Sequence, residues 1–248
     1  MKSLFRTALT AIVVIIITVV LGTTVLLASI LRVPHRINGI YDRAPRWWSK
    51  ILLWAAGVKV TIHGRENIPD DQSFVFTSNH VSLFDIPSLV ASLPRSYFVA
   101  KSELFKIPVF GPGIRAVGTI PIERANQKSA FGSYDVAADR IRNGNSVVVF
   151  PEGTRGLAYN IRPFKKGPFV LAIQAGVPVV PCLVHGTIEV LPKKSLKLNP
   201  GRVNVHLLEP VPTEGLTYDD RGTLAAKVNE RMARAMNELY LTTPADRK

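Results

Sequence analysis

The chain has 248 residues, a length that fits one domain and an additional element better than two full domains. Hydrophobic residues make up 47% of it, which excludes a disordered chain, and the single cysteine, Cys182, excludes an internal disulfide framework. The 31 Lys and Arg residues against 18 Asp and Glu give a net charge of +13. This charge indicates an anionic partner: nucleic acid, an anionic membrane face or a phosphorylated substrate.

The first feature along the chain is an uncharged stretch over residues 7–31, mostly Ile, Val, Leu and Ala. As a helix it would be about 37 Å long, enough to cross a hydrocarbon core of about 30 Å. A signal peptide has a shorter apolar region of roughly 7–15 residues and a small-residue cleavage site. The stretch therefore predicts a retained membrane anchor. A signal peptide and a helix buried in the soluble core are the alternatives.

Basic residues flank this stretch unevenly, because two precede it and five follow it. They are Lys2 and Arg6, then Arg32, Arg36, Arg43, Arg46 and Lys50. The richer flank stays on the cytoplasmic side of a membrane. We therefore expect a protein of the cell membrane whose body faces the cytoplasm. A helix or hairpin that lies in one leaflet would place the body on the same side.

A second amphiphilic segment, over residues 46–56, contains all three tryptophans of the chain. Trp47, Ile51 and Trp54 recur at helical spacing, and Trp rings favour the headgroup level of a membrane. The pattern predicts an interfacial helix, with a core-packing helix as the alternative. We therefore divide the chain into a two-helix membrane module at residues 1–57 and a second domain at residues 58–248.

In the second domain, short β-branched and aromatic runs alternate with helical stretches. The predicted strands are residues 73–77, 97–100, 118–122, 146–150, 178–183 and 203–208. The predicted helices are residues 86–93, 127–142, 168–175 and 222–241. This alternation predicts an α/β fold with a mixed, largely parallel sheet flanked by helices.

The first candidate chemistry is residues 79–85, which read NHVSLFD between a predicted strand and a predicted helix. Asp85 is expected to cap the helix, so that the chain folds back and brings His80 against it. One carboxylate oxygen would hold the Nδ1–H of His80 and leave Nε2 free to take a proton. No nucleophilic Ser or Cys is evident nearby, so the pair would activate a substrate hydroxyl directly. Backbone N–H groups near His80 are candidate oxyanion donors.

Three further clusters carry charge at the end of a predicted strand or before a predicted helix. They read GTIPIER at residues 118–124, FPEGTR at residues 150–155 and PFKKG at residues 163–167. Ligands of α/β sheets bind outside the carboxyl ends of strands, where a glycine-containing loop approaches a phosphate and an arginine pairs with it. Each cluster by itself is also compatible with a plain turn or a solvated charge.

Several familiar chemistries are absent from the sequence. It contains no nucleophile elbow, no P-loop and no dinucleotide-binding fingerprint. The five histidines and Cys182 lack metal-ligand spacing. A nucleic-acid module would interleave basic and exposed aromatic residues, which the chain does not do. Phosphate and lipid chemistry remain.

Taken in order, N-H-x4-D, G-T-I-P-I-x-R, F-P-E-G-T-R and the V-P-V-V-P of residues 177–181 resemble the glycerophospholipid acyltransferase family. They look most like the 1-acylglycerol-3-phosphate O-acyltransferases. The resemblance covers residues 59–208, and the N-terminal anchor is similar to the membrane module of that family. It implies a glycerolphosphate acyltransferase-like fold. Two positions depart from the motifs: Pro121 stands where Phe is common, and Gly156 where Ser is common.

The resemblance implies that His80 is the general base and that Asp85 orients it. It also implies a set of residues that bind the substrate. They are Lys101, Arg124, Glu152, Gly153, Thr154, Arg155 and Lys165.

The implied reaction moves an acyl group from acyl-CoA or acyl carrier protein to the sn-2 hydroxyl of lysophosphatidate. The product would be phosphatidic acid, in phospholipid biosynthesis, and no metal or bound cofactor is implied. The expected partners are the lipid bilayer, the lysophosphatidate and the acyl donor, not nucleic acid. A different lysolipid acceptor, such as a lyso-ornithine lipid or another lysophospholipid, and a non-catalytic lipid-binding protein are the alternatives.

Overall fold

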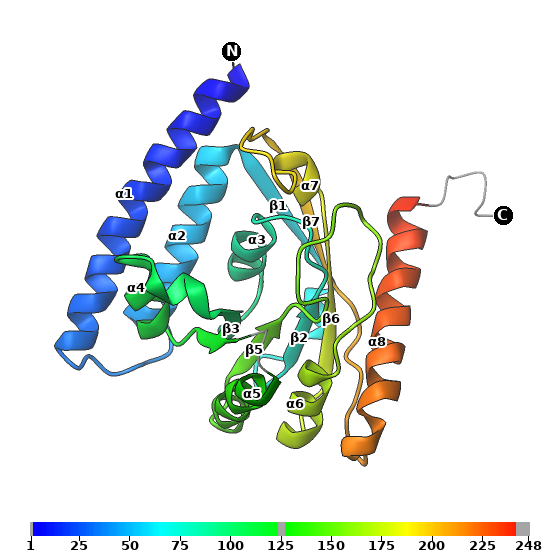
Figure 1. Cartoon of the computed structure of the whole chain (residues 1–248). Coiled ribbons are helices and arrows are strands. Elements are labelled where there is room, and N and C mark those ends of the chain that lie inside the picture. Colours follow the sequence, from blue (N-terminus) through cyan, green and yellow to red (C-terminus); the bar gives the residue numbers. More distant parts are fainter. Residues whose placement is uncertain (1, 124–126, 242–248) are drawn as a thin grey trace.

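The computed structural model describes residues 2–123 and 127–241, which build a seven-stranded sheet with helices on both faces (Figure 1). Its strands are β1 (Val58–His63), β2 (Val75–Ser78), β3 (Ser96–Lys101), β4 (Ile120–Ile122), β5 (Ser146–Val149), β6 (Val179–His185) and β7 (Gly201–Leu207). They lie in the order β1-β7-β6-β2-β5-β3-β4. Only the β6–β7 pair within this sheet is antiparallel. The mixed, largely parallel sheet is therefore confirmed.

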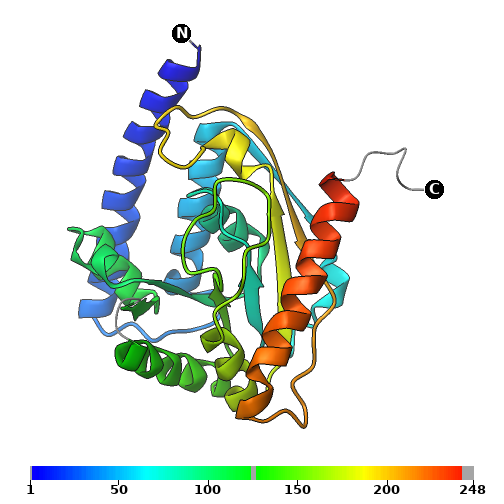
Figure 2. The same ribbon diagram turned by 45° about the vertical axis from the view of Figure 1, so that its right-hand side comes forward.

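Helices cover the two faces of this sheet unequally (Figures 1 and 2). The helices are α1 (Lys2–Ile30), α2 (Ile40–Ala56), α3 (Asp85–Ser92), α4 (Phe110–Ala116), α5 (Gln127–Arg142), α6 (Gly167–Ala175), α7 (Thr187–Val190) and α8 (Arg221–Met236). Short turns of other helical types are η1 (Arg65–Asn67), η2 (Ser102–Lys106), η3 (Tyr218–Asp220) and η4 (Asn237–Leu241). Helices α2 and α3 pack on one face and α5, α6 and α8 on the other.

The alternation of side chains along β5 divides the hydrophobic core into two layers. Val148 joins the layer under α2 and α3, whereas Val147 and Val149 join the layer under α5, α6 and α8. Successive side chains of a strand point to opposite faces, so this strand is buried on both. An uninterrupted valine run therefore marks the centre of the sheet.

The sequence did not predict β1 or α4. Helix α4 reads FGPGIRA, a poor helix former, and tertiary contacts hold it. A Cβ on Gly111 would lie 2.3 Å from the carbonyl oxygen of Phe105, and a Cβ on Gly22 would lie 2.9 Å from a side-chain carbon of Val109. The glycines thus allow α4 to approach both η2 and α1 closely, which local propensity does not reveal.

Helix α1 lies beside α2 along one side of the molecule (Figure 1). Near its start, Ser3 donates a hydrogen bond to the carbonyl of Leu198 (2.9 Å), and farther along the Nε1–H of Trp48 donates to Thr18 (2.9 Å). Its outer face is exposed and apolar. The residues of that face are Leu4, Phe5, Leu9, Ile12, Ile15, Ile16, Val19, Val20, Leu27 and Ile30. The helix is long and apolar enough to cross a membrane.

Helix α2 shows both of the faces that the sequence suggested. Leu52, Leu53 and Ala56 are buried in the main core layer, whereas the side chains of Trp47 and Trp54 are 46% and 77% exposed. The inner face packs as a core helix, and the outer face presents tryptophans as an interfacial helix does. The helix therefore belongs both to the N-terminal module and to the core.

Two neighbouring substitutions separate these faces. Leu53→Ala is expected to lower the free energy of unfolding by about 2–5 kcal/mol, because it leaves a cavity in the core. Trp54→Ala is expected to change it by less than about 0.5 kcal/mol, because Trp54 is largely exposed. Denaturant unfolding of the full chain in a non-ionic detergent measures both. Equal destabilisation by the two changes would contradict the division of α2 into a core face and an outer face.

Candidate active site

The structure places His80 and Asp85 in direct contact at the carboxyl end of β2. The Nδ1 of His80 lies 2.8 Å from Oδ2 of Asp85. The same oxygen accepts the backbone N–H groups of Val81 (2.7 Å) and Ser82 (2.8 Å). The expected helix cap is wrong, because Phe84 holds the N-cap position and Asp85 is the first residue of α3. Its carboxylate instead turns back onto the preceding turn and holds that turn against the imidazole.

The surroundings of Asp85 fix the tautomer of His80. Asp85 is fully buried, and its second oxygen accepts the hydroxyl of Thr187 at 2.6 Å. Because an ionised carboxylate only accepts hydrogen bonds, Nδ1 of His80 donates to it, and in the neutral imidazole the lone pair is then on Nε2. The ring stacks on Phe150, with 4.1 Å between centroids. The described residues form no hydrogen bond to Nε2, which leaves it available as a base.

Asn79 connects this turn to the next strand of the sheet. Its Nδ2 donates to the carbonyl of Val184 (2.9 Å), and its Oδ1 accepts the N–H of the same residue (2.8 Å). The amide side chain thus imitates a strand residue and continues the pairing of β2 with β6 by one step. We assigned no role to Asn79 from the sequence, although an amide directly after a buried strand is a usable signal.

Glu152 supports the backbone of His80. Its Oε1 accepts the N–H of His80 at 3.1 Å, and its Oε2 accepts the Nε–H of Arg162 at 2.5 Å. The Glu152 side chain is 1% exposed. Burial raises the pKa of this carboxyl, and the hydrogen bonds from Arg162 and from the His80 backbone oppose that rise. Both oxygens are held by protein donors, so the geometry gives Glu152 a positioning role. Its contact with substrate stays a prediction.

The loop after β5 brings the remaining residues of the FPEGTR cluster next to His80. The N–H of Gly156 donates to the carbonyl of His80 at 2.7 Å. The adjacent Arg155 is half-buried, and its guanidinium pairs with no carboxylate in the described part of the chain. Its carbonyl accepts a hydrogen bond from Lys193 at 2.6 Å. A cation without an ion-pair partner therefore lies one residue from a backbone bond to the base.

Gly153, Thr154 and Lys165 lie around the same loop. Gly153 has φ +78°, and a Cβ there would lie 2.8 Å from Cε of Lys165, so the lysine stem crosses the turn at van der Waals distance. Thr154 is exposed, and its hydroxyl oxygen accepts a hydrogen bond from Arg162 at 3.2 Å. Only glycine fits the turn without strain.

Lys101 lies at the carboxyl end of β3, and Arg124 follows β4 in the sequence. Lys101 ends β3, and its Nζ forms an ion pair with Glu103 at 2.9 Å, which lowers the pKa of that carboxyl to about 2. Arg124 follows β4, whose carboxyl end lies at the same sheet edge because β4 is parallel to β3. Arg124 itself lies outside the described residues.

Residues that the sequence did not reveal also hold the site. The hydroxyl of Tyr159 donates to Glu189 (2.7 Å) and accepts the N–H groups of Gly186 (2.7 Å) and Ile188 (3.0 Å). This fixes the start of α7, which carries Thr187 to the carboxylate of Asp85. Arg162, Tyr159 and Thr187 have no regular spacing from the motifs, so only the tertiary structure identifies them.

The arrangement is suited to general-base chemistry on a hydroxyl next to an anionic group. The imidazole is oriented by a buried carboxylate, its free nitrogen faces away from that carboxylate, and Arg155 supplies positive charge nearby. The expectation that backbone N–H groups near His80 act as oxyanion donors is wrong for three of them. Those of His80, Val81 and Ser82 already donate to carboxylates.

The sequence and the fold of this chain are similar to those of known proteins. Residues 59–185 match the family model described as Acyltransferase. A chloroplastic 1-acyl-sn-glycerol-3-phosphate acyltransferase from Brassica napus is 35% identical over 214 residues, which are 82% of this chain and 60% of the plant protein. The 1-acyl-sn-glycerol-3-phosphate acyltransferase alpha of Homo sapiens is 36% identical over 190 residues, 76% of this chain and 67% of the human protein. The chain thus spans about two thirds or less of the length of these curated relatives.

A crystal structure shows a similar fold. The 1-acyl-sn-glycerophosphate acyltransferase PlsC from Thermotoga maritima has a TM-score of 0.82 and 29% sequence identity, and the match covers 98% of this chain and 98% of that chain. The similarity therefore includes the N-terminal helices as well as the sheet.

The ion pair between Glu152 and Arg162 is testable through its pH dependence. Arg162→Gln leaves a buried carboxylate without its cation and is expected to destabilise the protein by about 2–3 kcal/mol at pH 8. Loss of Arg162 raises the pKa of Glu152 further, so the folded state takes up a proton more readily than the unfolded state. The penalty is therefore complete above that raised pKa and shrinks as the pH falls through it.

Urea unfolding in detergent at pH 8 and pH 5 measures this difference. The control is the double variant Arg162→Gln/Glu152→Gln, which has no carboxylate to titrate and should show the same destabilisation at both pH values. A loss of stability in Arg162→Gln that is independent of pH would contradict the assignment of the cost to Glu152.

Proposed function

The chain belongs to the acyltransferase family, and we propose that it acylates the sn-2 hydroxyl of 1-acylglycerol-3-phosphate to form phosphatidic acid. The names of the relatives from Brassica napus, Homo sapiens and Thermotoga maritima support this acceptor. The observation that carries the proposal is the Nε2 of His80, which no described residue hydrogen-bonds. Buried Asp85 orients the imidazole, and Arg155 belongs to the loop that hydrogen-bonds the main chain of His80.

In the proposed reaction His80 acts as base and then as acid. Its Nε2 accepts the proton of the sn-2 hydroxyl while that oxygen forms a bond to the thioester carbonyl carbon. The tetrahedral intermediate collapses, the carbon–sulfur bond breaks, and the imidazolium returns the proton to the leaving thiolate. Base catalysis of this kind contributes about 10²–10⁴ in rate, and Asp85 stabilises the imidazolium that forms.

The phosphate of the acceptor is proposed to bind the cations of the loop after β5. Arg155 offers a planar guanidinium that pairs with two phosphate oxygens at once. Lys165 crosses the same loop, and Lys101 and Arg124 follow the neighbouring strands. A doubly charged phosphate has several lone pairs to satisfy, and convergent cations fix the acceptor so that its hydroxyl meets His80.

The acyl donor is proposed to be a thioester of coenzyme A or of acyl carrier protein. The chemistry at His80 is the same for both, because the atoms that react are the acceptor oxygen, the carbonyl carbon and the thiol sulfur. Both donors are anionic, and the net charge of +13 attracts either. The proposed reaction uses no metal and no resident cofactor.

The apolar outer face of α1 and the exposed tryptophans of α2 are proposed to hold the enzyme on the cytoplasmic face of the cell membrane. The unequal basic flanks of α1 support this side of the membrane. An acceptor with one acyl chain then stays in the bilayer while its headgroup reaches the site.

His80→Ala is expected to abolish acyl transfer to lysophosphatidate. Asp85→Asn, which disturbs the tautomer of His80, is expected to lower kcat by about 10³–10⁴. The assay measures transfer of a labelled acyl group to lysophosphatidate in detergent micelles. The donor is acyl-CoA in one series and acylated acyl carrier protein in the other. His63→Ala, at the end of the edge strand β1, is the control and should retain activity. Normal transfer by His80→Ala would remove the proposed base.

Arg155→Ala is expected to raise KM for lysophosphatidate by about 10–100-fold, because a charge-assisted hydrogen bond contributes about 1.5–3 kcal/mol. The KM for a monoacylglycerol, which has the same chain without the phosphate, should change by less than about threefold. Steady-state kinetics with both acceptors measures this split. Arg202→Ala removes an exposed arginine of β7 as a charge-matched control. Equal changes of KM for both acceptors would show that Arg155 does not read phosphate.

A further inference from the structure

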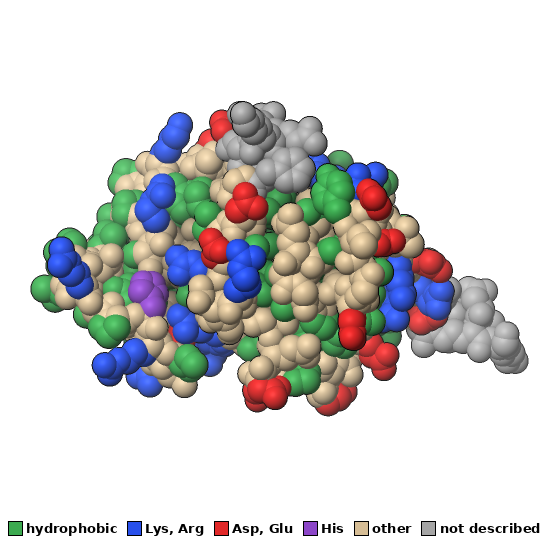
Figure 3. Space-filling model, turned by 90° about the horizontal axis from the view of Figure 1, so that it is seen from below, with side chains coloured by type: hydrophobic (Ala, Val, Ile, Leu, Met, Phe, Trp, Pro, Cys, Tyr) green, Lys and Arg blue, Asp and Glu red, His purple; other side chains and the backbone are tan. Residues whose placement is uncertain are grey.

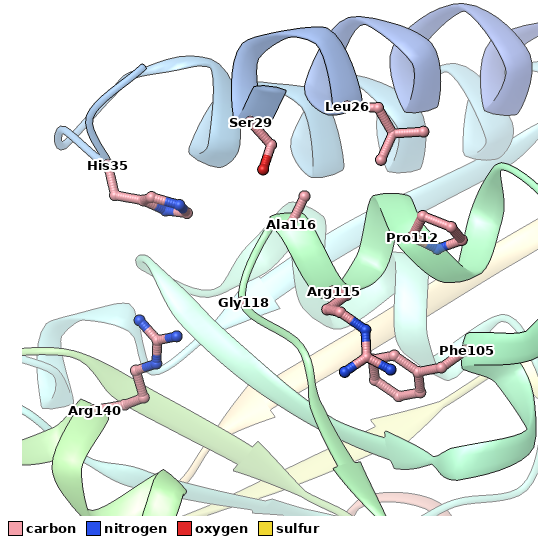
Figure 4. Close-up of a pocket in the computed structure, with 9 residues that line it drawn as sticks. All are labelled: Leu26, Ser29, His35, Phe105, Pro112, Arg115, Ala116, Gly118 and Arg140. Atoms are coloured by element: carbon pink, nitrogen blue, oxygen red, sulfur yellow. The ribbon is translucent and has the colours of Figure 1, made fainter. Parts of the chain in front are cut away.

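A cavity of about 430 Å³ lies between the last turns of α1, the loop after it, α4 and the last turn of α5 (Figure 4). Arg140, in that last turn, lies before the start of β5, whereas Phe150, which stacks on His80, follows the end of β5. Arg140 and His80 therefore lie at opposite ends of this strand. The function proposed above makes no use of the cavity.

Two guanidinium groups line the cavity, and each lies over an aromatic ring. The Cζ of Arg115 is 5.0 Å from the ring centroid of Phe105, and the Cζ of Arg140 is 5.0 Å from that of Tyr97. A ring holds the flat face of a guanidinium and leaves the N–H groups at its edge able to donate. In the described part of the chain, neither arginine forms an ion pair with a carboxylate.

Neighbouring groups respond to the positive charge of the cavity and do not neutralise it. His35 lines the cavity, and burial, followed by the charges of Arg140 and Arg95, lowers its pKa. Arg95 forms an ion pair with Asp42 at 2.8 Å. Since Asp42 is engaged by Arg95, the charges of Arg115 and Arg140 remain uncompensated.

The other wall of the cavity is apolar and continuous with the candidate membrane helix. Leu26 of α1 and Ala116 of α4 line the cavity, and Leu27, Ile30 and Leu31 next to it are exposed. Figure 3 shows Lys and Arg side chains gathered at this end of the molecule, on the side of α1 and α2. The apolar end of α1 therefore lies next to a group of cations. A lipid has the matching arrangement, with apolar chains next to a charged headgroup.

We propose that this cavity binds the phosphate headgroup of an anionic diacyl phospholipid, whose chains lie along the exposed last turns of α1. The guanidinium groups of Arg115 and Arg140, which form no ion pair with a carboxylate of the described residues, can both donate hydrogen bonds to phosphate oxygens. The apolar wall favours a lipid over free phosphate. The bound lipid is not a reactant: it holds this end of the protein at the membrane surface, at a distance from the catalytic edge.

The test measures the binding of dioctanoyl phosphatidylglycerol to the full chain in neutral detergent. Saturable binding of one lipid is expected, and Arg115→Gln/Arg140→Gln should raise Kd at least about tenfold, because two charge-assisted hydrogen bonds are lost. The control Arg32→Gln/Arg36→Gln removes the same charge from the same end outside the cavity and should change Kd by less than about twofold. Dioctanoyl phosphatidylcholine and inorganic phosphate are the comparison ligands, and both should bind at least about tenfold more weakly than phosphatidylglycerol.

A matched variant keeps the test valid if the Gln pair does not fold. Arg115→Lys/Arg140→Lys retains both charges without the planar fork, and it should bind phosphatidylglycerol more weakly than the unchanged protein. Arg155→Ala should leave Kd unchanged. This outcome separates the cavity from the phosphate site of the proposed function.

Four results would overturn the proposal. Equal losses in the cavity pair and in Arg32→Gln/Arg36→Gln would mean a diffuse surface charge. A loss in Arg155→Ala would place the lipid at the catalytic edge. Equal affinity for inorganic phosphate or for phosphatidylcholine would show that the cavity is not selective for an anionic lipid. Absence of saturable binding would show that the cavity is not a binding site.

Discussion

The candidate active site at the carboxyl end of β2 depends on the buried carboxylate of Asp85. It is fully buried, yet it accepts four hydrogen bonds: from the imidazole of His80, from two backbone N–H groups and from the hydroxyl of Thr187. An uncompensated charge in this position would cost several kcal/mol. The turn of residues 79–85 and the start of α7 must therefore be in place before the carboxylate is tolerated. Folding of this site and orientation of the base are the same event.

The main chain of His80 is held as firmly as its side chain. Its N–H donates to Glu152 and its carbonyl accepts from Gly156, and both partners belong to the loop that carries Arg155. A displacement of this loop would break both bonds, so the base and the cation keep one relative position. Arg162 extends the support, because it neutralises Glu152 and also holds Thr154. Such a shell explains how loop residues reach the precision that catalysis needs.

The elements of the sheet were predictable where the local pattern is strong. The valine run of β5 and the helix over residues 127–142 appear close to their expected bounds. Strand β1 was not predicted from the sequence, because most of its side chains are exposed and its pairing with β7 defines it. Helix α4 was not predicted either, because its sequence disfavours a helix. Contacts with α1 and η2 stabilise the helix instead. Tertiary contacts override local preference in both cases.

The part of the site that lies within short sequence motifs was predictable from the sequence. The contact of His80 with Asp85 follows from a short turn, which a sequence contains in full. Thr187 lies 102 residues from Asp85, and Arg162 lies 10 residues from Glu152 within a loop of no regular period. Their roles depend on how distant segments meet, and no spacing rule encodes that. The prediction that Asp85 caps α3 was wrong for a related reason. Its carboxylate accepts hydrogen bonds from His80, Val81 and Ser82, which precede it in the chain, and not from the first turn of the helix.

The course of α1 along the body has a kinetic consequence. Hydrogen bonds from Ser3 near its start and to Thr18 in its middle tie the helix to the rest of the chain, while its outer face is apolar. A helix bound in this way carries the whole body into the interface with it. The enzyme and its proposed lipid acceptor would then meet by lateral diffusion in two dimensions. The turnover rate would follow the mole fraction of acceptor in the surface, so that added inert lipid would slow the reaction at constant bulk concentration of substrate.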